Sequence, residues 1–205
     1  MSERTIPIPP GVQRVLAALN YIYLLLMMLV IAGVLTAAMT FQYVRGEVPC
    51  PLCLLERLAL FGVCFGIMRN FRHGFSYQNT GYSLVFALFL LIVSVRQSLL
   101  DIYPRPGHEY IGSAIFGIHM PVWSIIVALM ILIAYAIKMA AVGGDEYLEN
   151  ANIRTFPAIK TAADALSVYV IVILAINLVS VVLQCGLDQC HTFGYQLLGG
   201  PTTGP

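Results

Sequence analysis

The chain alternates between long apolar runs and short polar segments. No charged residue occurs between Arg14 and Arg45, and none occurs between Asp164 and Asp188. A helix needs about 20 mainly apolar residues to cross a hydrocarbon core of roughly 30 Å. By this measure the pattern predicts five membrane-spanning helices, at about residues 15–43, 51–68, 81–100, 121–142 and 165–184. We therefore expect an all-α membrane protein in which residues 1–205 form a single membrane domain ending in a tail at 185–205.

The polar segments between the predicted spans are short. Residues 70–80 are interpreted as a turn, and residues 143–164 as a longer loop on the same side of the membrane. Residues 101–120 form a loop on the other side, where three isoleucines between 111 and 118 have helical spacing. This spacing is typical of a short helix on the membrane surface, or of a lead-in to the fourth span. Both interpretations remain open.

Composition agrees with the membrane prediction and excludes several other classes of protein. Hydrophobic residues make up 59% of the chain and charged residues 10%, with a net charge of +1. Ordinary soluble domains contain roughly 45–50% apolar and about 25% charged residues. A soluble globular enzyme and a disordered chain are therefore excluded. A nucleic-acid-binding protein is also excluded, because the basic surface that it needs is absent.

The distribution of basic residues predicts the orientation in the membrane, because cytoplasmic segments carry an excess of Lys and Arg. With the N-terminus inside, the inner segments carry seven basic residues: Arg4, Arg14, Arg69, Arg72, Lys138, Arg154 and Lys160. The outer side carries four: Arg45, Arg57, Arg96 and Arg105. We expect a cytoplasmic N-terminus and a periplasmic C-terminus. The first span has no small-residue cleavage site and is expected to remain as a signal anchor.

The cysteines form two closely spaced pairs and one single residue. Cys50 and Cys53 lie where the second span begins, and Cys185 and Cys190 lie where the fifth span ends. Cys64 falls within the second span and is expected to be an apolar core residue. With an odd number of spans, both pairs face the same compartment. Disulfides persist outside a bacterial inner membrane, because that compartment is oxidising.

The spacing C-x-x-C brings two sulfurs together across one helical turn and is typical of redox motifs. Pro51 suits the first position of a helix, which places Cys50 at the N-cap and Cys53 in the first turn. A helix N-terminus stabilises the thiolate form of such a cysteine. Arg57 lies one turn deeper on the same face, where a charge within a span costs up to roughly 2.5–3.5 kcal/mol. This cost favours a role in holding a thiolate or a reduced acceptor, although snorkelling to the headgroups or pairing with Glu56 would also explain it.

Other interpretations of the cysteines were considered. The first pair could bind zinc with Cys185, Cys190 or His191 as further ligands, or could be inert. The tail pair could be a structural staple, but the loop between its sulfurs is so short that a disulfide there stabilises by only about 2 kcal/mol. Gly186 is expected to end the fifth helix and free the tail, which favours an exchangeable disulfide. The alternative function is a membrane metal-binding protein without redox turnover.

The stretch Pro49-Cys50-Pro51-Leu52-Cys53-Leu54-Leu55-Glu56-Arg57, with its flanks from Phe41 to Val63, resembles the disulfide bond formation protein B (DsbB) family. The resemblance continues in Tyr103-Pro104-Arg105-Pro106 and in Met120-Pro121-Val122-Trp123, and it covers roughly residues 15–142. It implies a four-helix bundle in the bacterial inner membrane. Such a bundle passes electrons from a periplasmic thioredoxin-fold thiol oxidase, DsbA-like, to ubiquinone or menaquinone.

The resemblance also implies roles for single residues. Cys50 and Cys53 match the quinone-coupled pair, with Cys53 next to the quinone, and Arg57 matches the arginine that stabilises the thiolate–quinone complex. Gln97 matches a position that assists the quinone. From its place at the start of the fourth span, Trp123 is expected to line the quinone pocket.

The chain departs from the common family pattern in one respect. Members usually carry the second cysteine pair between spans three and four, but residues 101–120 contain no cysteine. A fifth C-terminal span instead delivers Cys185 and Cys190 to the outer face. In this respect the chain resembles the five-span DsbI-type branch, which implies a dedicated, DsbL-like partner. The sequence thus predicts a disulfide-forming protein-thiol:quinone oxidoreductase.

Overall fold

The described residues of the computed structural model are 10–46, 49–103, 117–142 and 152–186. They form five long helices and one 3-10 turn: α1 (Pro10–Val44), α2 (Pro51–His73), α3 (Tyr77–Ile102), α4 (Met120–Val142), η2 (Ile153–Thr155) and α5 (Pro157–Cys185). All five long helices are long and apolar enough to cross a membrane. The prediction of an all-α, multi-pass membrane protein with a fifth C-terminal span is therefore confirmed.

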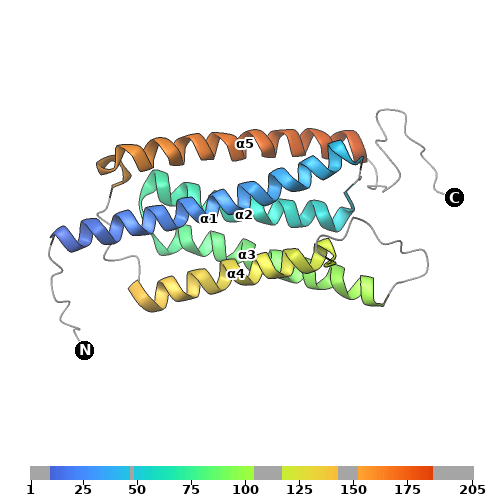
Figure 1. The fold of residues 1–205 in the computed structure, drawn as a ribbon, viewed down its shortest axis with the longest axis horizontal. Coiled ribbons are helices and arrows are strands. Elements are labelled where there is room, and N and C mark those ends of the chain that lie inside the picture. Colours follow the sequence, from blue (N-terminus) through green and yellow to red (C-terminus); the bar gives the residue numbers. More distant parts are fainter. Residues whose placement is uncertain (1–9, 47–48, 104–116, 143–151, 187–205) are drawn as a thin grey trace.

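The five helices run side by side along the long axis of the molecule (Figure 1). α2 packs on α3 and α3 on α4, while α5 lies along α1 and also contacts α2. At one end of this bundle α1 ends, α2 begins, α3 ends, α4 begins and α5 ends. We call this the cysteine end and define it by residues 49–57, 97, 123–124 and 184–185.

The packing of α1 follows from its apolar spacing. Its fully buried side chains recur at steps of four and three residues: Ala17, Tyr21, Leu24, Met28, Ile31 and Leu35. This spacing of about 3.5 residues keeps one stripe of the helix facing its neighbours. Leucines on the other side, including Leu19, Leu26 and Leu29, are more than half exposed. That surface is available to lipid.

α2 and α3 approach each other closely at two glycines of α2. A β-carbon added at Gly62 would overlap the ring of Phe86, and one at Gly66 would overlap Ser83. The hydroxyl of Ser83 also donates a hydrogen bond to the backbone oxygen of Val63 at 3.1 Å. The absence of side chains at these two positions therefore lets the helix backbones come together.

The predicted turn at residues 70–80 is wrong in extent. α2 continues to His73 and α3 begins at Tyr77, so only three residues connect them. Two of the polar residues that suggested a longer turn, Asn70 and Asn79, are buried and complete the hydrogen bonds of this short connection. The side chain of Asn70 accepts from the backbone N–H of Ser76 at 3.4 Å, and Asn79 donates to the backbone oxygen of Gly74 at 3.2 Å.

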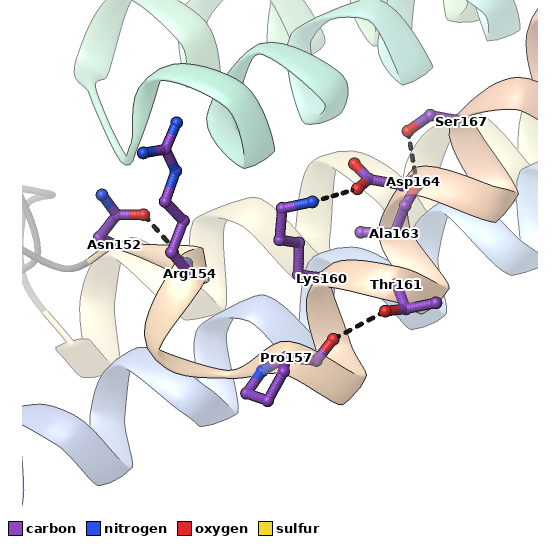
Figure 2. Close-up of polar contacts among 8 residues, drawn as sticks. All are labelled: Asn152, Arg154, Pro157, Lys160, Thr161, Ala163, Asp164 and Ser167. Carbon is purple, nitrogen blue, oxygen red and sulfur yellow. Dashed lines mark hydrogen bonds and ion pairs between the residues drawn. The ribbon is translucent and has the colours of Figure 1, made fainter.

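The predicted loop at residues 143–164 is also too long, because α5 already begins at Pro157. Figure 2 shows the polar residues around this start. The side chain of Asn152 accepts from the backbone N–H of Arg154 at 3.0 Å, and Lys160 forms an ion pair with Asp164 at 2.6 Å. These exposed residues belong to η2 and to the first turns of α5. The surface helix considered within residues 101–120 falls mostly on residues 104–116, which lie outside the described residues.

Candidate active site

Cys50 and Cys53 are joined by a disulfide, with their Cα atoms 5.1 Å apart. Cys50 has the extended backbone of an N-cap, Pro51 opens α2, and the sulfur of Cys50 accepts the backbone N–H of Cys53 at 3.1 Å. The sulfur of Cys50 thus does what a serine or aspartate oxygen does at other helix starts. Cys50 is buried and Cys53 is half-buried. The predicted placement of both cysteines at the start of a helix is confirmed.

Gln97 reaches this disulfide from the last turns of α3. Its side-chain amide nitrogen lies 3.4 Å from each of the two sulfurs, within hydrogen-bonding distance. The side chain is buried, and its oxygen has no hydrogen-bond partner among the described residues. The structure therefore brings Gln97 together with Cys50 and Cys53, and the two sulfurs share its amide nitrogen as a hydrogen-bond donor.

Arg57 is buried, with an exposed fraction of 8%. It donates from one terminal nitrogen to Gln42 Oε1 at 2.6 Å and to Asn177 Oδ1 at 3.0 Å. Its other terminal nitrogen donates to the backbone oxygen of Ala38 at 3.2 Å. The guanidinium therefore lies between α1 and α5. Snorkelling to the headgroups does not describe this buried side chain.

Glu56 precedes Arg57 in the chain but turns to a different part of the bundle. Its Oε2 accepts a hydrogen bond from the hydroxyl of Ser124 on α4 at 2.8 Å, and its buried Oε1 has no hydrogen-bond partner among the described residues. The bonds of Arg57 to α1 and α5 therefore take the place of the Glu56 pairing considered from the sequence. Trp123 lies beside Ser124 in the first turn of α4 and is half-buried.

The end of α5 lies against the residue that precedes the first cysteine pair. Gln184 is fully buried and donates to the backbone oxygen of Pro49 at 2.8 Å. The next residue, Cys185, is buried and disulfide-bonded. Gly186 ends the helix with φ 59°, as expected, and Cys190 lies outside the described residues. Cys185 is thus held at the same end of the bundle as the Cys50–Cys53 disulfide.

The remaining candidates bear on the metal-binding alternative. Within the described ranges, no three His, Cys, Asp or Glu side chains gather closely enough to hold a metal ion. The Cys50–Cys53 disulfide occupies both sulfurs that a metal would need as thiolates. Cys64 is a free thiol with no exposed surface, as expected for a core residue, and His191 lies outside the described residues.

Three polar residues at this end were not predicted as parts of the site: Gln42, Asn177 and Gln184. A signal for them was present in the sequence, because Asn177 and Gln184 interrupt a charge-free apolar run and Gln42 ends another. Polar side chains inside a span are costly and usually bind something. Asn177 and Gln184 are also seven residues apart, which places them on one face of α5.

Comparison with known proteins finds a family that is similar to the part of the chain that carries this site. The sequence model of the family described as "Disulfide bond formation protein DsbB" matches residues 20–109. Over this segment the chain is similar to the DsbB family. Cys50, Cys53, Arg57 and Gln97 all lie within it, whereas Trp123 and the residues of α5 lie beyond it.

Curated relatives agree with this family. The proteins named "Disulfide bond formation protein B" from Burkholderia pseudomallei (strain 1106a) and Burkholderia mallei (strain ATCC 23344) are each 26% identical over 147 residues. Each match covers 57% of this chain and 87% of the relative. No solved structure matches the chain significantly. The similarity to DsbB proteins thus comes from the sequence, while the contacts of the site with α5 come from the structure.

Proposed function

We propose that the chain is a membrane thiol:quinone oxidoreductase that reoxidises a periplasmic thioredoxin-fold disulfide donor. One observation carries the proposal: a disulfide at the start of a membrane-spanning helix, within the DsbB-family segment, whose two sulfurs share the amide donor of Gln97. A disulfide in this place is ready to accept electrons from thiols. The metal-binding alternative has no comparable support.

The route for incoming electrons is the tail pair. The hydrogen bond from Gln184 to Pro49 supports a common face for both pairs, because it holds the end of α5 beside the start of α2. We infer that this face is periplasmic and that the N-terminus is cytoplasmic, on the basis of the Lys/Arg distribution. The surrounding membrane is then the bacterial inner membrane.

In the proposed reaction, a thiolate of the reduced partner attacks the Cys185–Cys190 disulfide and forms a mixed disulfide. The partner's second thiol resolves this bond, so the partner leaves oxidised and the tail pair becomes a dithiol. One thiolate of the tail dithiol then attacks Cys50, and Cys53 leaves as a thiolate. The second tail thiol resolves this mixed disulfide, so the Cys185–Cys190 disulfide forms again and Cys50 and Cys53 are both left reduced. The helix N-terminus and the amide of Gln97 favour the Cys53 thiolate electrostatically.

The electron acceptor would be held close to Cys53. A bound ubiquinone or menaquinone supplies a two-electron, two-proton acceptor. Cys53 is the more exposed residue of its pair, and Gln97 has a buried oxygen without a partner in the described part of the chain. Arg57 offers a buried positive charge that favours a reduced acceptor, and Trp123 adds an aromatic wall from α4. These side chains fit a polar quinone head in an apolar surrounding.

We also propose that the chain belongs to the five-span, DsbI-like branch. The support is the fifth membrane helix, which carries Cys185, together with a cysteine-free segment at residues 101–120. The partner would then be a dedicated, DsbL-like oxidase rather than a general DsbA-like one.

The proposal is tested with purified protein in detergent, a reduced thioredoxin-fold oxidase and a short-chain ubiquinone. We expect quinone-dependent oxidation of the partner, measured by the loss of quinone absorbance and by free-thiol counting. Cys53→Ser should abolish it, because the sulfur next to the acceptor is lost. Cys64→Ala is the matched control, since it removes a cysteine of the same helix that lies in the core, and it should retain turnover. Metal retention without turnover in the unmodified protein would contradict the proposal.

A further inference from the structure

We propose that Asn177 of α5 is a positioning residue for the quinone site, because it holds the guanidinium of Arg57 in place. The inference rests on the proposed function and deepens it. It gives the fifth helix a second task besides carrying Cys185, and it concerns a residue that lies outside the DsbB-family segment.

The geometry around Arg57 carries the argument. Three oxygens from two helices accept from its two terminal nitrogens: Gln42 Oε1 and the Ala38 backbone oxygen from α1, and Asn177 Oδ1 from α5. A planar guanidinium with donors in a rigid fork is fixed in direction when acceptors lie on more than one side. Asn177 supplies the side that α1 does not.

These bonds orient the charge without cancelling it. An amide or peptide oxygen carries no formal charge, so the three bonds satisfy donors of Arg57 and leave its positive charge intact. A carboxylate in the place of Asn177 would neutralise the guanidinium. An asparagine therefore suits a site where the charge must remain available to a thiolate or to a reduced, anionic acceptor.

Neighbouring contacts fix the register of α5 against α1 and α2. Ser180 is hydrogen-bonded to the hydroxyl of Tyr43, and Gln184 donates to the backbone oxygen of Pro49. With Asn177, these side chains are spaced by three and four residues and lie on one buried face of α5. These contacts hold α5 in the register in which Asn177 faces Arg57.

The test is a double-mutant cycle that combines Asn177→Leu with Arg57→Met, measured with short-chain ubiquinone. If Asn177 acts through Arg57, Asn177→Leu alone raises the KM for quinone about tenfold, in line with the loss of a hydrogen bond to a charged group, with a smaller effect on kcat. In the Arg57→Met protein the same change has no further effect. Asn177→Gln, which keeps the amide, should recover most of the affinity.

A readout without quinone turnover accompanies the cycle. In the reduced, quinone-free protein, Asn177→Leu should slow the alkylation of Cys53 at fixed pH several-fold, because the thiolate is the reactive form and loses a nearby oriented charge. Asn20→Leu is the matched control, since Asn20 is another buried asparagine but lies in the first half of α1. It should change neither measurement.

Three results would overturn the inference: an unchanged KM in Asn177→Leu, effects of Asn177→Leu and Arg57→Met that multiply, or equal losses in the Asn20 and Asn177 variants. If Asn177→Leu does not fold, Asn177→Gln and Asn177→Ser are compared, and equal KM values for these two overturn it as well. A wild-type protein that does not use quinone would instead refute the proposed function.

Discussion

The two halves of α5 use most of their polar side chains in different ways. In the first half several polar side chains bond within the helix itself: Thr161 donates to the backbone oxygen of Pro157, and Lys160 pairs with Asp164 (Figure 2). One side chain there reaches α1, because the hydroxyl of Tyr169 is hydrogen-bonded to that of Thr36 at 2.8 Å. In the last third, Asn177 and Ser180 bond side chains of α2 and α1, and Gln184 bonds the chain just before Cys50.

The buried face of α5 changes character along its length in the same way. It presents Ala163, Val170 and Ile173 in the first part, and Asn177 and then Ser180 and Gln184 near the cysteine end. Apolar packing holds two helices together but tolerates small shifts, whereas buried hydrogen bonds require particular partners. The contrast indicates that α5 is placed most specifically near Cys185, at the end of the bundle that also holds the Cys50–Cys53 disulfide.

Among substitutions that test this contrast, Gln184→Leu is expected to have the largest effect on turnover. The change leaves the buried backbone oxygen of Pro49 without its donor, at a cost of about 1–3 kcal/mol, and frees the end of α5. We expect partner oxidation to fall about tenfold while reduction of quinone by a small dithiol persists. Stopped-flow measurement of both reactions checks this. Equal losses in both would show that Gln184 does not serve the tail pair specifically.

A second variant tests whether a helix other than α5 also affects the rate at which the Cys50–Cys53 disulfide is reduced. Gln97→Leu on α3 removes the donor that both sulfurs share and leaves the contacts of α5 in place. Because such a hydrogen bond contributes about 0.5–1.5 kcal/mol, we expect a severalfold slower reduction of this disulfide and no loss of fold. The rate with a small dithiol measures it, and an unchanged rate would assign no role to Gln97.

Ser180→Ala should have a smaller effect than either. It removes the bond to Tyr43, which touches neither the cysteines nor Arg57, so the loss is about 1 kcal/mol of stability or less. The free energy of unfolding is measured in mixed micelles by titration with SDS. We expect turnover to change by less than twofold. A drop in turnover as large as that in Gln184→Leu would show that contacts that only pack the helices matter as much as those that place the cysteines.

Lys160→Ala, in the first half of α5, should have the smallest effect. The ion pair with Asp164 is exposed, and such pairs contribute only about 0.3–0.5 kcal/mol. Both the stability in SDS titration and the turnover should remain within error of the unmodified protein. A loss above 1 kcal/mol would show that the two halves of α5 are held with similar specificity.

Much of the fold could be predicted from the sequence, because a span is a property of one continuous segment. The apolar runs predict all five helices, and Pro51 and Gly186 mark a helix start and a helix end correctly. The errors fall where polar residues lie in helices. Asn70 and Asn79 suggested a long turn, yet they are buried in α2 and α3 and satisfy the short connection between them.

The site was predictable only in part, for a physical reason. Cys50, Cys53 and Arg57 lie within eight residues, so helix geometry alone relates them. The partner of Arg57 on α5 is 120 positions away, and nothing local links the two. Local reasoning also left two neighbours as possible partners, Glu56 and Arg57, which in the structure turn to different helices.

The close approach of α2 and α3 has a consequence for how electrons are delivered. At Gly62 and Gly66 the two helices lie so close that an added β-carbon would overlap residues of α3. The sulfurs at the start of α2 and the amide of Gln97 on α3 therefore lie on two closely packed helices. Under the proposed function, the partner thiols and the oxidant would have to move to this sulfur pair, while the pair itself stays in place.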